Sequence, residues 1–176
     1  MQITLSCRLE DSRRAFLQCM LCMSGLAALS ACAGPPRRDI TATTSDEPQA
    51  LATINAYRAE AGLGPVRLDP ALRAAALRQA MAMGEAGLLS HEVAGALRER
   101  LEAAGMRDVI AAENIGRGTP DVTRAILSWR GSPAHDRNLR LAQATRIGLA
   151  RADGAGGPWW ALVLAGDQRE GARWSL

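Results

Sequence analysis

Three side chains of this sequence could act together chemically: two histidines and one glutamate. His91 and His135 are the two histidines of the 176-residue chain. Each is expected in a loop just past a helix, beside a serine: His91 follows Ser90, and His135 comes three residues after Ser132. Glu113 lies between them in the sequence, with apolar residues rather than a charge pattern around it. These three residues are the candidate site.

Two imidazoles and a carboxylate can serve three different purposes. They can hold a divalent cation such as zinc, with water at the open position. They can also share protons or bind the polar head of a ligand without any metal. In the third interpretation, the histidines only cap helix ends or satisfy loop carbonyls. The spacing of the three residues leaves all three interpretations open.

Familiar hydrolase motifs are incomplete in this chain. His91-Glu92 begins like a zincin motif, but Gly95 stands where the second histidine is required. A Gly-x-Ser-x-Gly elbow is absent from the sequence. A serine nucleophile, Ser90 or Ser132, would have Glu113 as its only acid. Whether the protein is an enzyme is therefore left open by its motifs.

Helical periodicity dominates the first two thirds of the region after residue 48. Apolar residues at intervals of three and four predict helices over residues 49–62, 69–87, 93–104 and 119–133. Asp69 is expected to cap the second of these, with Pro70 at its first helical position. The alanines on the buried side of that helix predict a close approach to a neighbouring element.

The period changes toward the C-terminus. Residues 146–151 alternate in polarity, and residues 159–165 are apolar and contain tryptophan and valine, so both are expected as strands. Three glycines and a proline between them predict a turn and hence an antiparallel hairpin. A third strand is expected at 112–117. The combination predicts an α+β domain over residues 49–176, built as a three-layer α-β-α sandwich with a small antiparallel sheet.

The N-terminal 31 residues have the pattern of an export signal. Arg13 and Arg14 are followed by Phe16-Leu17, and this pattern resembles a twin-arginine signal. The uncharged run from Ala15 to Ala31 is short for a membrane span and contains polar residues. An ordinary secretory leader with adjacent arginines is the alternative.

The leader ends in a sequence that resembles a lipobox, Leu29-Ser30-Ala31-Cys32. Cleavage before Cys32 would let its sulfur carry a diacylglycerol; the alternative is a small-residue cleavage site with an incidental cysteine. The other cysteines fall within the leader, so the exported domain must be stable without disulfides.

Residues 32–48 are polar, contain proline and are expected to form a flexible tether. The protein is therefore expected to be lipid-anchored on the periplasmic side of a bacterial membrane. Ala33, after the lipid-bearing cysteine, favours the outer membrane.

Charge and aromatic content argue against nucleic-acid binding. All 21 basic residues are arginine, balanced by 18 acidic residues, and aromatic residues make up 3% of the chain. Recognition of DNA or RNA needs a clustered basic face with interleaved aromatics, whereas these arginines are scattered singly. We expect no nucleic-acid partner, and we expect a monomer.

Six motifs in a fixed order resemble the CAP superfamily of cysteine-rich secretory, antigen 5 and pathogenesis-related proteins, in its bacterial form. They occupy residues 54–58, 68–72, 90–91 with 100–105, 112–115, 129–135 with 138–139, and 146–149. The resemblance covers nearly all of residues 49–166. It implies an α-β-α sandwich around a small antiparallel sheet.

The resemblance also implies that His91, Glu113 and His135 converge in one central cleft. Family members can bind zinc or another divalent ion through the two histidines. Many eukaryotic members have a second glutamate where this chain has Ser132, so support for a two-carboxylate acid–base mechanism is lacking here. The disulfides of eukaryotic members are absent as well.

Two functions follow as hypotheses. In the first, the cleft binds a small lipid, sterol-like or peptide ligand, with His91, Glu113 and His135 as polar anchors and with or without a metal. In the second, the protein is a metal-dependent hydrolase of peptide or cell-wall bonds, in which the histidines hold the ion and Glu113 activates its water. The cleft is implied more firmly than a reaction, so binding is the preferred hypothesis.

Overall fold

A computed structural model describes residues 39–154 and 156–168 of the chain. The expected leader, the lipobox cysteine Cys32 and residues 33–38 of the expected tether lie outside the described residues. Within the described residues, no helix is both long enough and apolar enough to cross a membrane.

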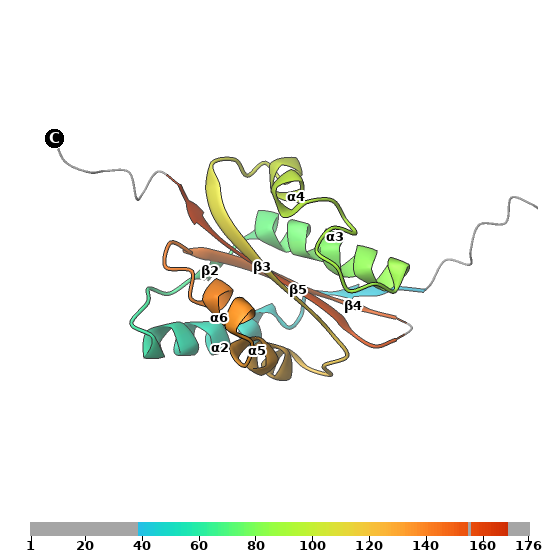
Figure 1. Ribbon diagram of the computed structural model, residues 1–176, viewed down its shortest axis with the longest axis horizontal. Helices are drawn as coiled ribbons and strands as arrows, with labels where there is room; N and C mark the ends of the chain where they lie inside the picture. The colour runs from blue at the N-terminus through green and yellow to red at the C-terminus, as the bar shows by residue number, and fades with distance from the viewer. Residues whose placement is uncertain (1–38, 155, 169–176) are drawn as a thin grey trace, which may run out of the picture. The chain divides into compact units, whose positions relative to one another are not determined.

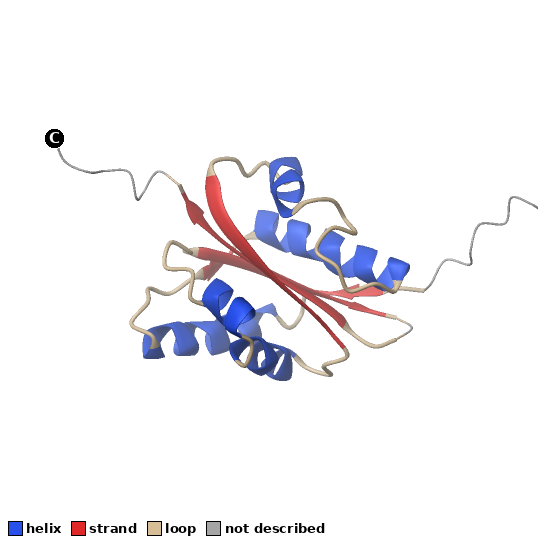
Figure 2. Ribbon diagram, in the orientation of Figure 1, coloured by secondary structure: helices blue, strands red, loops and turns tan. Residues whose placement is uncertain are grey.

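The centre of the domain is a twisted sheet of five strands (Figures 1 and 2). Four of them lie in the order β1-β4-β5-β3 and are all antiparallel, while the short β2 pairs in parallel with the start of β4. The expected hairpin and the expected third strand are confirmed, and both are longer than the sequence suggested. The strands are β1 (Thr41–Thr43), β2 (Arg67–Leu68), β3 (Val109–Arg117), β4 (Arg146–Asp153) and β5 (Trp159–Asp167).

Helices cover both faces of this sheet, which confirms the three-layer architecture (Figure 1). One layer contains α3 and α4, and the other contains α2, α5 and α6. Their bounds are α2 (Glu47–Glu60), α3 (Pro70–Ala86), α4 (Leu97–Ala103), α5 (Val122–Arg130) and α6 (Pro133–Leu139).

The helix α3 shows how local sequence sets an element. The Asp69 side chain accepts hydrogen bonds from the backbone N–H groups of Ala71 (2.8 Å) and Leu72 (3.3 Å), as an N-cap should. Pro70 follows at the first helical position, and Gly87 ends the helix with a left-handed φ of 66°. The cap and the terminator predicted from the sequence are both present.

The two faces of the sheet are packed differently. Toward α2, α5 and α6 the strands present large side chains such as Leu149 and Leu162. Toward α3 they present mainly small ones, including Ala150 and Ala161. A Cβ atom on Gly148 would lie 2.1 Å from the backbone nitrogen of Arg73, so the backbone of α3 rests directly on the sheet. The alanine-rich stripe of α3 thus has the close neighbour that the sequence predicted.

Several boundaries differ from the expectation; α4, for example, begins at Leu97 instead of residue 93. Residues 41–43, expected in the flexible tether, form β1 on the edge of β4, because backbone pairing holds a polar Thr-rich segment that has no hydrophobic pattern. The prediction that His135 lies in a loop is also wrong. α5 ends at Arg130, and Pro133 is the first residue of a further helix, α6, which contains His135.

Candidate functional site

The strand β3 positions the carboxylate of the candidate site. It is the edge strand of the sheet, and successive side chains point to opposite faces. Glu113 lies opposite Val163, which belongs to the core under α3. Asn114 lies opposite Leu162, which belongs to the core under α2, α5 and α6. Glu113 therefore faces the layer of α3 and α4, and Asn114 faces the layer of α2, α5 and α6.

Glu113 is buried and holds a different partner on each carboxylate oxygen. Its Oε1 lies 2.8 Å from His91 Nδ1, and its Oε2 lies 2.6 Å from Arg100 Nη1. The Arg100 side chain is 1% exposed and that of Glu113 is 3% exposed, so this ion pair is shielded from water. His91 and Glu113, two of the three candidate residues, are therefore in direct contact.

Arg100 ties the loop between α3 and α4 to the rest of its layer. Its guanidinium donates to the backbone carbonyls of Gly95 (3.1 Å), Ala75 (3.3 Å) and His91 (3.5 Å). The wholly buried side chain of Gln79, on α3, donates from Nε2 to the carbonyl of Ser90 at 2.6 Å. These bonds fix the backbone on both sides of the His91 ring.

The contact with Glu113 also sets the tautomer of His91. An ionised carboxylate only accepts hydrogen bonds, so Nδ1 must carry the proton that it donates to Oε1. In the neutral ring, Nε2 then has a free lone pair. The His91 side chain is half exposed, so it can meet a ligand or a metal ion while its other nitrogen is held.

His135 reaches the same strand from the other helical layer. Asn114 Nδ2 donates to the backbone carbonyl of His135 at 3.1 Å. Asn138, one turn further along α6, donates from Nδ2 to the Glu113 carbonyl at 3.0 Å and to Asn114 Oδ1 at 2.9 Å. Two asparagine amides therefore fasten α6 to β3, next to the residue that holds His91.

The electrostatics link the two imidazoles. Burial lowers the pKa of His135 from its ordinary value near 6.5, and the neighbouring His91 lowers it further. Charge on one ring is therefore felt by the other, although they belong to different layers. At neutral pH His135 is held in its uncharged form, which can accept a hydrogen bond.

Arg100 is the main residue of this site that the sequence did not single out. It lies three residues after Leu97, on the same side of α4 as the inward Leu97 and Leu101. An arginine on an apolar stripe is the available signal, because a buried charge requires a partner. Its partner, Glu113, could not be identified from spacing, since a loop and a strand separate the two.

The donor set gives limited support to a zinc centre. Within residues 39–154 and 156–168, no three side chains of His, Cys, Asp or Glu lie close enough together to hold a metal ion. Both oxygens of Glu113 are engaged already. In this arrangement the three candidate residues do not fit a site with three protein ligands, so no chemical step is derived through a metal.

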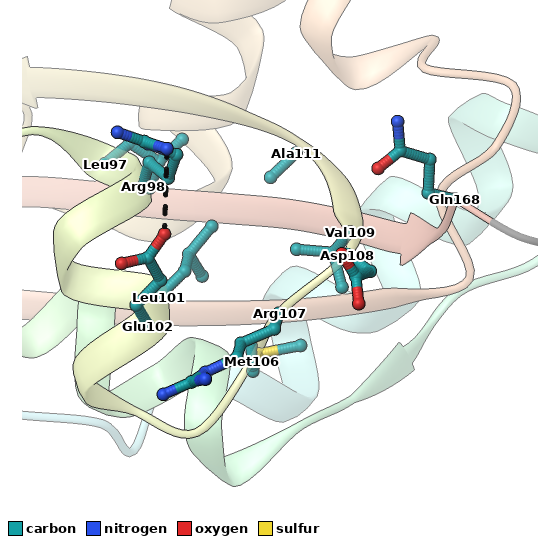
Figure 3. A pocket seen from close by; sticks show the side chains of 10 residues that line it. All are labelled: Leu97, Arg98, Leu101, Glu102, Met106, Arg107, Asp108, Val109, Ala111 and Gln168. Carbon is teal, nitrogen blue, oxygen red and sulfur yellow. Dashed lines mark ion pairs between the residues drawn. The ribbon is translucent and has the colours of Figure 1, made fainter.

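A separate pocket lies along β3 on the same face of the sheet as Glu113 (Figure 3). It measures about 890 Å³ and does not contain the three candidate residues. Ala111 lines it and lies two residues before Glu113, about 7 Å along the strand. Its apolar lining comes from α4, the following loop and β3: Leu97, Leu101, Met106, Val109 and Ala111.

The helical layers, the sheet and the motifs along them define the class of protein. The chain belongs to the cysteine-rich secretory protein family, also called CAP, whose model matches residues 51–164. The resemblance recognised in the sequence is confirmed. Among curated proteins, none matches the chain.

Solved structures from three bacteria share the fold. An outer surface protein of Borrelia burgdorferi is 18% identical with a TM-score of 0.66, and the match covers 74% of this chain and 98% of that one. An extracellular protein of Bacillus anthracis with an SCP domain is 23% identical with a TM-score of 0.62; the match covers 68% of this chain and 40% of that one.

A cysteine-rich secretory protein of Staphylococcus aureus is 20% identical with a TM-score of 0.51, over 67% of this chain and 39% of that one. The present chain thus spans about two fifths of the two longer proteins. At these identities the likeness concerns the fold alone.

Proposed function

We propose that this protein is a ligand-binding module of the bacterial cell envelope, anchored to a membrane through a lipid on Cys32. In this proposal, His91, Glu113 and His135 line a polar cleft that holds the head of a small ligand. The family membership and the fold support the general class. The cleft and its ligand are the parts that experiments must test.

The observation that carries the proposal is the connected set His91–Glu113–Arg100. A buried arginine and a buried carboxylate hold one imidazole in a single orientation while half of that imidazole faces outward. A ring that only stabilised the loop would not need to be half exposed. Such preorganisation lowers the entropic cost of binding a polar group.

A lipid is the ligand that the surroundings favour. Leu88 and Leu89 are exposed and come just before Ser90 and His91 in the chain. On the other side, the pocket of Figure 3 begins about 7 Å along β3 from Glu113, and apolar side chains such as Leu101 and Met106 line part of it, beside charged ones. A ligand with a polar head and an apolar chain matches this combination of polar cleft and apolar surroundings.

The site favours binding over hydrolysis. In the hydrolase hypothesis, Glu113 activates a metal-bound water, which requires a free carboxylate oxygen facing that water. Here one oxygen is held by Arg100 and the other by His91. Glu113 is better suited to positioning His91 than to taking a proton from water.

The proposed location is extracytoplasmic. The leader and lipobox predicted from residues 1–32 motivate it, and similar structures come from an outer surface protein of Borrelia burgdorferi and an extracellular protein of Bacillus anthracis. Growing the producing cells with radioactive palmitate tests the anchor, because a lipidated chain takes up the label. A Cys32→Ser change should abolish the labelling.

Ligand binding is tested with the mature region, residues 33–176, and oleoyl-lysophosphatidylglycerol as the probe, with a short peptide library in parallel. We expect saturable binding of the lipid that the double change His91→Ala/His135→Ala weakens by at least about tenfold, a loss near 1.4 kcal/mol. Arg124→Met is the control, because the Arg124 side chain on α5 is 69% exposed; this variant should bind the lipid normally.

Other outcomes are equally informative. Binding of peptides but not of the lipid would change the ligand class and keep the site. Lipid binding that survives the double change would place the ligand elsewhere, in the pocket of Figure 3. If neither class binds, the binding proposal fails. A zinc titration of the same two proteins tests the metal: binding lost in the double change would add an ion to the cleft.

A further inference from the structure

Two adjacent leucines stand out on the surface at the end of α3. Leu88 is 55% exposed and Leu89 is 48% exposed, directly after the glycine that ends the helix. The only other large apolar side chain exposed to this extent among the described residues is Leu127, at 52%, on α5. Single exposed leucines are common on soluble proteins. A pair two residues from a candidate site needs a reason of its own.

A second observation places the start of the described chain at the same end of the domain. Ile40 packs against the last turn of α3: a Cβ atom on Gly84 would lie 3.0 Å from Ile40 Cδ1. Leu88 follows Gly84 by four residues and lies just past the end of α3. Figure 1 shows β1, at the blue beginning of the described chain, beside the C-terminal end of α3.

The distance to the proposed anchor is short. Six residues, 33–38, lie between Cys32 and Asp39, where the described domain begins, and a fully extended segment from Cys32 to Asp39 spans at most about 25 Å. The sequence predicted a tether reaching residue 48, but β1 shortens it. A lipid on Cys32 would therefore bring this particular end of the domain to the membrane surface.

The charged side chains near Leu88 and Leu89 do not by themselves indicate which partner this surface contacts. Arg117 is exposed near this end; it stacks on Trp159 with 4.5 Å between its guanidinium carbon and the ring centroid, and Gly84 lies beside the same tryptophan. The exposed Glu85 of α3 offsets it. The apolar pair is thus the feature that distinguishes this surface, and a tether makes even a weak contact effectively intramolecular.

We propose that Leu88 and Leu89 form a membrane-contact tip that enters the interfacial region of the phospholipid bilayer to which the chain is anchored. The contact holds the cleft at His91 next to the bilayer surface, so that lipid can enter it directly from the membrane. This inference rests on the proposed anchoring through Cys32.

The test uses the full chain, lipidated by the producing cells and reconstituted into vesicles of phosphatidylethanolamine and phosphatidylglycerol. Leu88→Trp and Leu127→Trp each add one reporter at an exposed position, so neither should disturb folding, which circular dichroism checks. Replacing the lipids by brominated analogues quenches tryptophans that enter the bilayer. We expect the added emission of Leu88→Trp to be largely lost and that of Leu127→Trp to be retained.

The possible results separate the proposals. Equal quenching of the two reporters, or none of either, overturns the membrane-contact tip. Failure of the chain to float with the vesicles overturns the anchor and the tip together. Neither result touches ligand binding, because binding of lysophosphatidylglycerol by residues 33–176 is measured without a bilayer.

Discussion

In the part of the chain that the structure describes, each face of the sheet buries one arginine, and the two arginines have different kinds of partner. Arg58, on α2, and Arg100, on α4, are both almost completely shielded from solvent. Arg58 has only backbone carbonyls as partners, whereas Arg100 has a carboxylate as well. The comparison separates a residue that holds the fold from one that arranges a site.

Arg58 organises the loops of its own layer. Its guanidinium donates to the carbonyls of Gly64 (2.9 Å), Leu139 (2.9 Å), Leu141 (3.0 Å) and Ala144 (3.1 Å). Burial lowers the pKa of the Arg58 guanidinium from its ordinary value, which lies far above neutral pH. The charge is thus balanced by peptide dipoles, and no titratable side chain is oriented by it.

Arg100 combines the same task with a second one. It also bonds three carbonyls, but its strongest partner is Glu113, which in turn holds His91. On this face the buried Arg100 fixes Glu113, and Glu113 in turn orients the half-exposed ring of His91. We conclude that a buried arginine indicates a site when its partner is a carboxylate with a second, accessible partner.

The largest expected effect is a loss of stability on the face of the sheet that contains Arg58 and no candidate site. Arg58→Met leaves four carbonyls without their donor, and an unsatisfied buried polar group costs about 1–3 kcal/mol. We expect a loss of at least about 3 kcal/mol in the free energy of unfolding, measured by urea denaturation of residues 33–176. Arg67→Met, at an exposed position, is the control. A loss below about 1 kcal/mol would contradict the structural role of Arg58.

Breaking the ion pair on the other face should destabilise the protein by a comparable amount. Arg100→Met strands the buried Glu113 carboxylate, for which about 3–5 kcal/mol is typical. The double change Arg100→Met/Glu113→Gln removes both charges and should recover part of the loss. Arg98→Met is the matched control, because Arg98 lies on the same helix and is 86% exposed. Its ion pair with Glu102 is long, at 3.9 Å, and exposed to solvent. This variant should change stability by less than about 0.5 kcal/mol.

The single change Glu113→Gln tests whether the carboxylate on this face, and not the buried arginine on the other, supports ligand binding. The substitution keeps the shape but removes the charge that holds His91 Nδ1–H, and charge-assisted hydrogen bonds contribute about 1.5–3 kcal/mol. We expect lysophosphatidylglycerol to bind about tenfold more weakly or worse. Arg58→Lys, which changes only the other face, should leave the affinity of folded protein unchanged. If Glu113→Gln and Arg58→Lys changed the affinity for the lipid equally, Glu113 would not have the proposed positioning role.

The smallest expected effect concerns pH. Because the pKa of His135 is lower in the folded protein than in the unfolded chain, the unfolded chain takes up the proton first as pH falls. His135 therefore costs no stability above about pH 6.5, and stability declines as pH falls from there through its folded pKa. His135→Gln should flatten that part of the profile in urea denaturation. A steeper decline in the variant would contradict the assigned direction.

Much of this account could be predicted from local sequence. The cap at Asp69, the stop at Gly87 and the hairpin of β4 and β5 follow from short patterns, and they appear where expected. The strand β1 and the helix α6 do not follow from such patterns. Backbone pairing holds the first, and the second has only seven residues, beginning at a proline that is equally typical of a helix end.

The candidate site depended more on contacts that sequence spacing does not encode. His91 and Glu113 are identifiable as chemically suited partners, and they touch. Arg100 is not, because pairing α4 with β3 requires the tertiary fold. The same holds for the amides of Asn114 and Asn138, which bring α6 to the edge strand.

The ring nitrogens of His91 and His135 give the most direct test of how the cleft is organised, since the chain contains no other histidine. Long-range nitrogen–proton NMR spectra of residues 33–176 should show His91 protonated at Nδ1, and both rings should shift when lysophosphatidylglycerol is added. In Glu113→Gln, His91 should lose its fixed tautomer. A His91 ring protonated at Nε2, or ring signals that stay unmoved while the lipid binds, would contradict a cleft organised by Arg100, Glu113 and His91.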